Sequence, residues 1–331
     1  MKKILITGAN GFIGSNLTEE ALKQDYHVYA GVRKNSDLSN IEKLPVTFVT
    51  LDYPNKKSLT GFLKEHGKFD YVVHIAGVTK ACKEETFTKV NYEYTRNLVE
   101  ALIETNQIPE KFIFMSSLAA IGPGDEKTLK PVDDTVKPHP VSAYGRSKLK
   151  AEQYLNSLKD FPFIILRPTG VYGPREKDFL LVFKNIRSGF ETYIGSKKQH
   201  LTFLHVGDLV KLILSLLESN ITNKAYFVND LKYYTVTEFI SIVKETLDKK
   251  TLTLIFPKPL AALIARLWEK SSCSFLKKPP VFNNDKFKEV IQKNWLCDSS
   301  ALVRDINFRP EYDLKKGIPQ TIQWYKERRM L

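Results

Sequence analysis

The sequence is poor in cysteine, with Cys82, Cys273 and Cys297 as its only three thiols among 331 residues. Their odd number and wide spacing match neither a disulfide framework nor a metal-binding pattern. We therefore predict no metal site and a protein whose cysteines are reduced in the cytoplasm.

Long apolar runs are also missing. The first apolar run ends at Thr7, which is too short for the hydrophobic region of a signal peptide. The most apolar later stretch, Leu260 to Leu267, is short and contains Arg266, so it does not read as a membrane span. These absences predict no membrane partner. For this stretch we predict a helix that packs against the rest of the protein. A lid helix or a surface for a partner is the alternative.

The charge is unbalanced, because 50 Lys and Arg against 37 Asp and Glu give a formal net charge of +13. The lysines are spread along the chain and do not alternate with aromatic residues in one stripe, so we predict no nucleic-acid partner. The excess instead favours small anionic ligands. Apolar residues at 43% and charged residues at 26% are values typical of globular proteins.

A short apolar run, Lys3 to Thr7, stops at glycines spaced three apart, and a helical pattern follows. This order of strand, glycine loop and helix is typical of dinucleotide binding: Gly8 permits the turn, Gly11 lets backbone N–H groups approach a pyrophosphate, and Gly14 lets the helix pack closely. The cofactor-binding residues predicted here are Gly8, Asn10, Gly11, Phe12, Ile13 and Gly14.

The second predicted strand, Tyr26 to Arg33, ends in a basic residue where NAD-binding proteins usually carry an acid. Arg33 can accept a 2′-phosphate, whereas an acid would repel it. We therefore predict NADP(H) as the preferred cofactor, with NAD(H) as the alternative. A third strand, Val46 to Leu51, ends at Asp52, which either meets the adenine amino group or caps the next helix.

Further strands alternate with helical patterns. Tyr71 to Gly77 closes on the small residues Ala76 and Gly77, and Lys111 to Met115 is followed by two serines. This alternation predicts an α/β fold of Rossmann type, a doubly wound parallel sheet whose ligand crevice lies at the carboxyl ends of its strands. His74 is interpreted as a strand histidine, not a ligand.

Tyr144 and Lys148 are four residues apart at the start of a predicted helix, so their side chains share one face. The same spacing occurs by chance at Tyr53 with Lys57 and at Tyr193 with Lys197. Only the first pair follows a serine-terminated strand in a dinucleotide fold, which makes it the candidate for chemistry.

Taken together, these motifs resemble the extended short-chain dehydrogenase/reductases, which include nucleotide-sugar epimerases and dehydratases and the dihydroflavonol-reductase-like and 3β-hydroxysteroid-dehydrogenase-like enzymes. The resemblance covers nearly the whole chain. Its carriers are Thr7-Gly8-x-x-Gly11-x-x-Gly14, His74-x-Ala76-Gly77, Val90-Asn91, Ser116-Ser117, Tyr144-x-x-x-Lys148, Leu166-Arg167-Pro168-x-x-Val171-Tyr172-Gly173-Pro174-Arg175 and Phe203-x-His205-Val206-x-Asp208-Leu209.

The resemblance implies a catalytic set of Ser117, Tyr144 and Lys148. It also implies cofactor contacts at Ala76, Gly77, Asn91, Tyr144, Lys148, Pro168 and Val171, and we predict substrate contacts at Thr79, Ser117 and Arg175. It further implies a nucleotide-binding domain of residues 1–172 and 202–230 with a substrate-binding cap of residues 173–201 and 231–331. A homodimer is one assembly that the sequence leaves open.

The chemistry of this set is a proton transfer coupled to hydride transfer. Reducing a carbonyl leaves an alkoxide, so Tyr144 is predicted to donate a proton to the oxygen that Ser117 holds. A nearby Lys148 ammonium is expected to favour the phenolate and to lower the pKa of Tyr144.

Two departures from the family pattern narrow the substrate. Leu201 stands where nucleotide-sugar epimerases usually carry a diphosphate-binding arginine, and Leu118 and Ala119 stand where 4,6-dehydratases carry Asp-Glu. The leading hypothesis is an NAD(P)-dependent oxidoreductase acting on a secondary alcohol or ketone. A nucleotide-sugar 4-epimerase and a non-catalytic dinucleotide-binding sensor are the alternatives.

Overall fold

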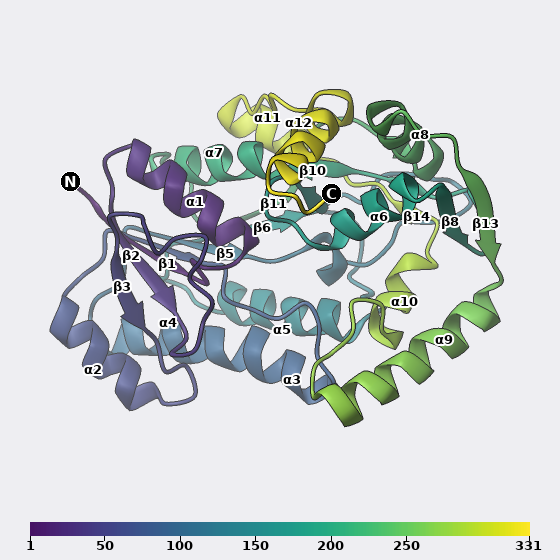
Figure 1. The fold of residues 1–331 in the computed structure, drawn as a ribbon. Coiled ribbons are helices and arrows are strands. Elements are labelled where there is room, and N and C mark those ends of the chain that lie inside the picture. The colour runs from purple at the N-terminus through teal and green to yellow at the C-terminus, as the bar shows by residue number, and fades with distance from the viewer.

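A seven-stranded sheet runs through the centre of the computed structural model, which describes residues 1–331 (Figure 1). Its strand order is β11-β6-β5-β4-β1-β2-β3, and every neighbouring pair is parallel. The strands are β1 (Lys3–Thr7), β2 (His27–Val32), β3 (Thr47–Thr50), β4 (Tyr71–His74), β5 (Lys111–Met115), β6 (Phe163–Pro168) and β11 (Lys224–Val228). The predicted doubly wound Rossmann-type fold is confirmed.

Helices cover both faces of this sheet (Figure 1). One face carries α1 (Phe12–Lys23), α7 (Val206–Leu217) and α11 (Ser300–Ile306), and the other carries α2 (Lys56–His66), α4 (Tyr94–Glu104) and α5 (Ala143–Asn156). Successive residues of a strand face opposite layers, so Ile4 and Ile6 enter one apolar core and Leu5 enters the other. Burial on both faces explains why these strands are continuous apolar runs.

The strand order reverses between β1 and β4, since the chain winds outward from β1 to β3 and then returns to the other side of β1. In a doubly wound sheet this reversal opens a crevice at the carboxyl ends of the two central strands. The glycine loop after β1 and the Ala76-Gly77 segment after β4 leave the sheet at that point.

The remaining elements build a smaller layer beside the sheet (Figure 1). They are β8 (Phe190–Ile194), β9 (His200–Leu201), β12 (Tyr234–Thr235), β13 (Leu252–Phe256), β14 (Asn294–Trp295), α6 (Asp178–Arg187), α8 (Val236–Leu247), α9 (Lys258–Ser271), η3 (Ser272–Leu276), α10 (Asn284–Val290) and α12 (Leu314–Glu327). The other short elements are α3 (Glu84–Thr88), η1 (Lys89–Glu93) and η2 (Leu118–Ala120), and the two strands β7 (Gly170–Tyr172) and β10 (Phe203–His205), which pair with each other.

A third apolar core holds this layer together, with Phe183, Phe239 and Tyr325 among its buried aromatic residues. Leu302 and Phe308, although late in the chain, pack into the core of the large sheet. The predicted bounds of the two domains stay a prediction.

Cys82 and Cys273 form a disulfide that joins the segment after β4 to η3, and only Cys297 is free. The prediction that all the cysteines are reduced is therefore wrong for this pair. It failed because the two thiols are separated by 191 positions and only the tertiary fold brings them together.

Two results concern the stretch from Leu260 to Leu267. It is helical, as α9, and it packs through Ala261 and Ala265, but its large apolar side chains are exposed, which the preference for a packed helix did not predict. No helix in the structure has both the length and the apolar character needed to span a bilayer.

Candidate active site

The turn from β1 into α1 has the shape of an anion cradle. Gly8 has a φ of +68°, and a Cβ atom at Gly14 would lie 2.1 Å from the Gly8 carbonyl oxygen, so neither position accepts a side chain. Gly11 caps α1 without any side-chain hydrogen bond, which leaves the first backbone N–H groups of the helix for a ligand. These features fit the diphosphate of a dinucleotide.

A buried hydrogen-bond network holds this loop against β4. The Thr7 hydroxyl accepts from the backbone N–H groups of Ile75 and Ala76, both at 3.1 Å, and it bonds His74 Nδ1 at 2.8 Å. His74 Nε2 bonds the Thr95 hydroxyl at 2.9 Å. Burial lowers the pKa of His74 to about 3, so the ring is neutral. His74 is a structural histidine, as predicted.

The segment after β2 lies over the glycine loop, because the Asn10 amide donates to the Asp37 carbonyl at 3.2 Å. Arg33 is exposed there, and its backbone N–H donates to the Ser36 hydroxyl at 3.1 Å. No ion pair occupies its guanidinium, which is therefore available to an anionic ligand.

Asp52 is exposed at the end of the third strand. The residue that caps α2 is Asn55, whose side chain accepts from the Ser58 N–H at 3.2 Å. The alternative role of Asp52 as a helix cap is therefore wrong, because α2 begins one turn later than that role requires.

Ser117 lies just beyond the carboxyl end of β5, and α5, which carries Tyr144 and Lys148, contacts the η2 segment that follows Ser117. Ser142 caps α5 by accepting from the Gly145 N–H at 3.0 Å, and this fixes the first turn that carries Tyr144. The Ser117 hydroxyl accepts from the Ala119 N–H at 3.1 Å. The adjacent Ser116 instead bonds the buried Glu152, which explains why only the second serine faces the site.

Lys148 is buried, and its ammonium donates to the Met115 carbonyl at 2.6 Å. It also lies 4.8 Å from the centre of the Phe114 ring. Burial lowers the pKa of Lys148 to about 8, although the Glu152 charge opposes this change. The side chain also approaches Gly77, since a Cβ there would lie 3.4 Å from Lys148 Nζ.

The pKa of Tyr144 is raised above its ordinary value, first by burial and then by the Glu289 charge, while hydrogen bonding with Ser117 acts in the opposite direction. The predicted lowering of this pKa is therefore wrong for the protein alone. Its expected cause, the Lys148 ammonium, is engaged with the Met115 carbonyl. A protonated phenol is the form that a proton donor needs.

Two carboxylates from α10 reach the start of α5, and the sequence reasoning missed both. Asp285 accepts from the backbone N–H groups of Ala143 and Tyr144, at 2.7 and 3.1 Å. Glu289 accepts from the Ser142 hydroxyl at 2.7 Å and pairs with Lys286 at 3.0 Å. Nothing local in the sequence links these residues to Tyr144.

A family model described as the NAD dependent epimerase/dehydratase family matches residues 4–228. The chain belongs to this family. It is an enzyme of the extended short-chain dehydrogenase/reductase type, as its motifs predicted. The family is NAD-dependent.

Similar proteins span almost the whole chain. A ceramide reductase of Caulobacter vibrioides is 24% identical, covering 98% of this chain and 94% of the relative. A UDP-glucose 4-epimerase of Vibrio cholerae is 28% identical, covering 97% and 95%. The crystal structure of a UDP-glucose 4-epimerase from Thermotoga maritima with UDP-glucose superposes with a TM-score of 0.80 at 20% identity, covering 98% and 99%.

Other residues predicted from the family pattern lie around this site. Asn91 is buried, and its side-chain amide accepts from the Val78 N–H and donates to the Val78 carbonyl and to the Ser147 hydroxyl. Both polar atoms of this amide thus hold the segment after β4 against α5. Thr79 is exposed in that segment. Pro168 ends β6 and Val171 lies in β7, where the chain leaves the seven-stranded sheet.

The substrate contact predicted for Arg175 stays a prediction, and in this structure the side chain has a protein partner. Its guanidinium pairs with Glu19 of α1 and reaches the Ser15 hydroxyl at 3.4 Å. In this chain of the epimerase/dehydratase family, Arg175 therefore joins the segment after β7 to α1, and a carboxylate already compensates its charge.

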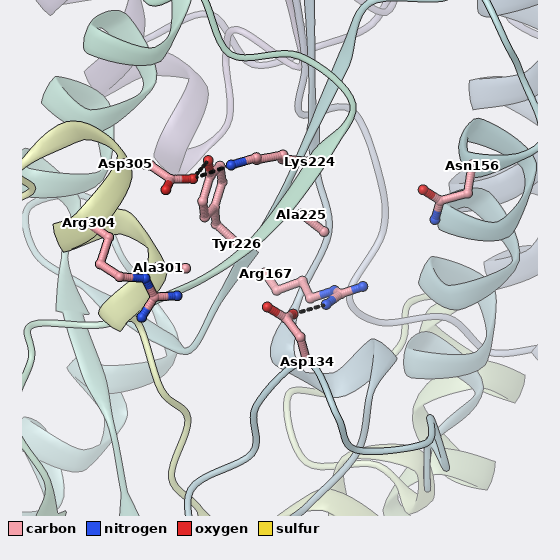
Figure 2. Close-up of a pocket in the computed structure, with 9 residues that line it drawn as sticks. All are labelled: Asp134, Asn156, Arg167, Lys224, Ala225, Tyr226, Ala301, Arg304 and Asp305. Carbon is pink, nitrogen blue, oxygen red and sulfur yellow. Dashed lines mark hydrogen bonds and ion pairs between the residues drawn. The ribbon is translucent and has the colours of Figure 1, made fainter.

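Figure 2 shows a separate hollow near β6 and β11. Most of its charged side chains already have partners: Lys224 and the Tyr226 hydroxyl both bond Asp305, and Arg167 pairs with Asp134. None of the predicted site residues lines it. The crevice at the glycine loop is therefore the better candidate for catalysis.

Proposed function

We propose that the chain is an NAD(P)-dependent oxidoreductase that interconverts a secondary alcohol and a ketone. The observation that carries the proposal is a half-buried Tyr144 with a raised pKa, grouped with Ser117 and Lys148 at the same edge of the sheet as the glycine loop.

A nicotinamide dinucleotide, when bound in the crevice, would supply or accept the hydride. The glycine loop would bind its diphosphate, and Lys148 would bind a ribose hydroxyl. Ser117 donates a hydrogen bond to the substrate oxygen and fixes its position. Tyr144 gives its proton to that oxygen during reduction and removes the alcohol proton in the reverse direction.

NADP(H) is the cofactor form that we propose within the NAD-dependent family. Arg33 supports it, since this exposed guanidinium follows the second strand, has no carboxylate partner and can bind a 2′-phosphate. Asp52 would accept a hydrogen bond from the adenine amino group.

For the substrate we propose a weakly charged body. Two buried phosphates require paired donors, yet Leu201 holds the position of the usual arginine and Arg175 is neutralised by Glu19. The similarity to a ceramide reductase supports a ketone or alcohol on a lipid-like chain. A nucleotide-sugar 4-epimerase is the second candidate, because a UDP-glucose 4-epimerase is similar over nearly the full length.

We also propose a cytoplasmic location, where nicotinamide nucleotides are available. The Cys82–Cys273 bond is unusual in that compartment, and thiol labelling of the protein from lysed cells measures whether the bond forms there. A homodimer stays a prediction.

Replacing Tyr144 with Phe tests the chemistry. The Y144F enzyme should keep its nucleotide affinity and lose about 10² to 10⁴-fold in turnover of a long-chain ketone, because only the proton donor is removed. The matched control is Ser116→Ala, which alters the serine that faces away from the site. Ordinary turnover by Y144F would refute the role of Tyr144.

Calorimetry with UDP separates the two candidate functions. The nucleotide-saturated enzyme should bind UDP weakly, whereas micromolar binding, together with tightly held NAD in the purified protein, would favour the epimerase.

A further inference from the structure

The helix α9 packs with its small residues inward and its large apolar residues outward. Ala261 and Ala265 of α9 are buried, as is Ser272 at the start of η3, whereas Leu267 is 60% exposed and Trp268 is 56% exposed. At 100° per residue the exposed apolar residues form one continuous stripe on the outer side of the helix. An ordinary surface helix has the opposite arrangement.

The stripe continues beyond the helix into η3, where Phe275 is 84% exposed. We call this surface the α9 face, and its residues are Leu260, Leu263, Ile264, Leu267, Trp268, Phe275 and Leu276. In Figure 1 α9 lies at the outer edge of the molecule, following β13, and α10 stands between it and α5. Contiguous exposed apolar surface of this kind marks a place of interaction.

Every exposed charge on this segment is positive. The cations are Lys258, Arg266, Lys270, Lys277 and Lys278. The one acid, Glu269, is turned inward and accepts from the Asn284 N–H at 3.1 Å. The α9 face is therefore an apolar stripe flanked by cations, without any exposed acid among them.

We propose that the α9 face docks on the surface of a bilayer that contains anionic lipids. Large aliphatic side chains and a Trp beside Lys and Arg are the combination that binds helices in the plane of a membrane interface. α9 has 14 residues, so it would lie on the bilayer without crossing it. The sequence predicted no membrane partner because it contains no membrane-spanning segment, and docking on the surface of a bilayer does not require such a segment.

A second copy of the chain suits this surface less well. In a symmetric dimer the same patch meets itself, so the cations of one α9 face would be brought against those of the other. Such like-charge contacts oppose association, whereas anionic headgroups complement the same cations.

The attachment of α9 fits docking, because the helix is fixed to the rest of the enzyme. The disulfide at Cys273 ties its carboxyl end to the segment after β4. Glu269 holds the start of α10, which in turn contacts the first turn of α5 through Asp285. Docking would thus fix the orientation of the active-site crevice relative to the bilayer.

Vesicle sedimentation tests the proposal with the full-length enzyme. Vesicles of three parts phosphatidylcholine to one part phosphatidylglycerol should bind the wild type, and vesicles of phosphatidylcholine alone should bind it far less. The variant Leu263→Ser/Leu267→Ser/Trp268→Ser should bind the anionic vesicles at least ~10-fold more weakly, because the lost apolar contacts are those that enter the interface. Arg266→Ala and Lys270→Ala should each weaken binding about fivefold.

Matched controls change the same residue types elsewhere. Ile103→Ser alters an exposed apolar residue of α4, and Lys64→Ala removes an exposed cation of α2, so neither should alter vesicle binding. Nucleotide affinity checks that each variant is folded, and the single variants Leu267→Ser and Trp268→Ser replace the triple variant if it is unfolded.

Equal binding of wild type and the α9 variants to anionic vesicles would overturn the proposal. The proposal would also be overturned if the wild type did not bind the vesicles, in particular if light scattering showed that the wild type is a dimer and the triple variant is a monomer. That result would assign the α9 face to a second copy. Failure of docking would leave the Tyr144→Phe result, and with it the proposed oxidoreductase chemistry, unaffected.

Discussion

Removing the Asp285 side chain should destabilise the start of α5, although the two residues whose N–H groups it accepts from lie far from it in the sequence. Its carboxylate accepts from the Ala143 and Tyr144 N–H groups and is only 15% exposed, so water replaces it poorly. Each charge-assisted hydrogen bond contributes about 1.5 kcal/mol. Asp285→Ala should therefore lower the free energy of unfolding by about 3 kcal/mol, with Ser142 still capping the helix.

Asp285→Asn separates the hydrogen bonds from simple loss of packing. Its amide keeps one acceptor oxygen of nearly the same shape, so the expected loss is about half, near 1.5 kcal/mol. Urea unfolding followed by circular dichroism measures both variants. The control is Asp133→Ala, which also removes two hydrogen bonds, but within an exposed turn at Thr135, and should cost less than about 0.5 kcal/mol.

The explanation is refuted if Asp285→Ala is as stable as Asp133→Ala. It is also refuted if the Asn and Ala variants lose the same free energy, because the remaining acceptor would then have no effect.

Three other predictions concern the cofactor, the glycine loop and acid stability. Arg33→Asp should weaken NADPH binding and favour NADH, because a phosphate partner is replaced by a repelling charge, and fluorescence titration would show no change of preference if Arg33 has no such role. Gly14→Ala should abolish nucleotide binding, since its Cβ would lie 2.1 Å from the Gly8 oxygen, whereas Gly61→Ala, with open space around it, should be neutral in the same titration. Burial alone would raise the pKa of Glu191, but hydrogen bonds, first from Thr253 and then from Lys244, lower it to about 2 from an ordinary 4.5. The wild type should therefore be more stable than Glu191→Gln above pH 4.5, and this difference should disappear as the pH falls toward 2. A difference in thermal melts that stays constant across that range would contradict the assignment.

The sequence predicted what depends on neighbours along the chain. The strand Lys111–Met115 has its predicted bounds, and the order of strand, glycine loop and helix at Gly8 and Gly14 is as expected. Both follow from local geometry, since apolar runs form strands and a crowded turn requires glycine.

The failures depend on distance in space. Asp285 and Ala143 are 142 positions apart, and no local pattern records their hydrogen bond. For α9 the apolar spacing predicts one stripe but does not tell whether that stripe faces the core or the solvent. The small residues Ala261 and Ala265 on the other side decide this in the folded chain.

The position of β11 in the sheet has a consequence for biosynthesis. β6, an apolar strand, pairs with β5 on one side and with β11 on the other, and β11 ends only at Val228. While the ribosome makes the intervening α6 to α7, β6 is an open sheet edge that can pair with other nascent chains. A fragment that stops before Lys224 keeps that edge permanently, so residues 1–223 should aggregate when they are expressed without the strand that completes the sheet.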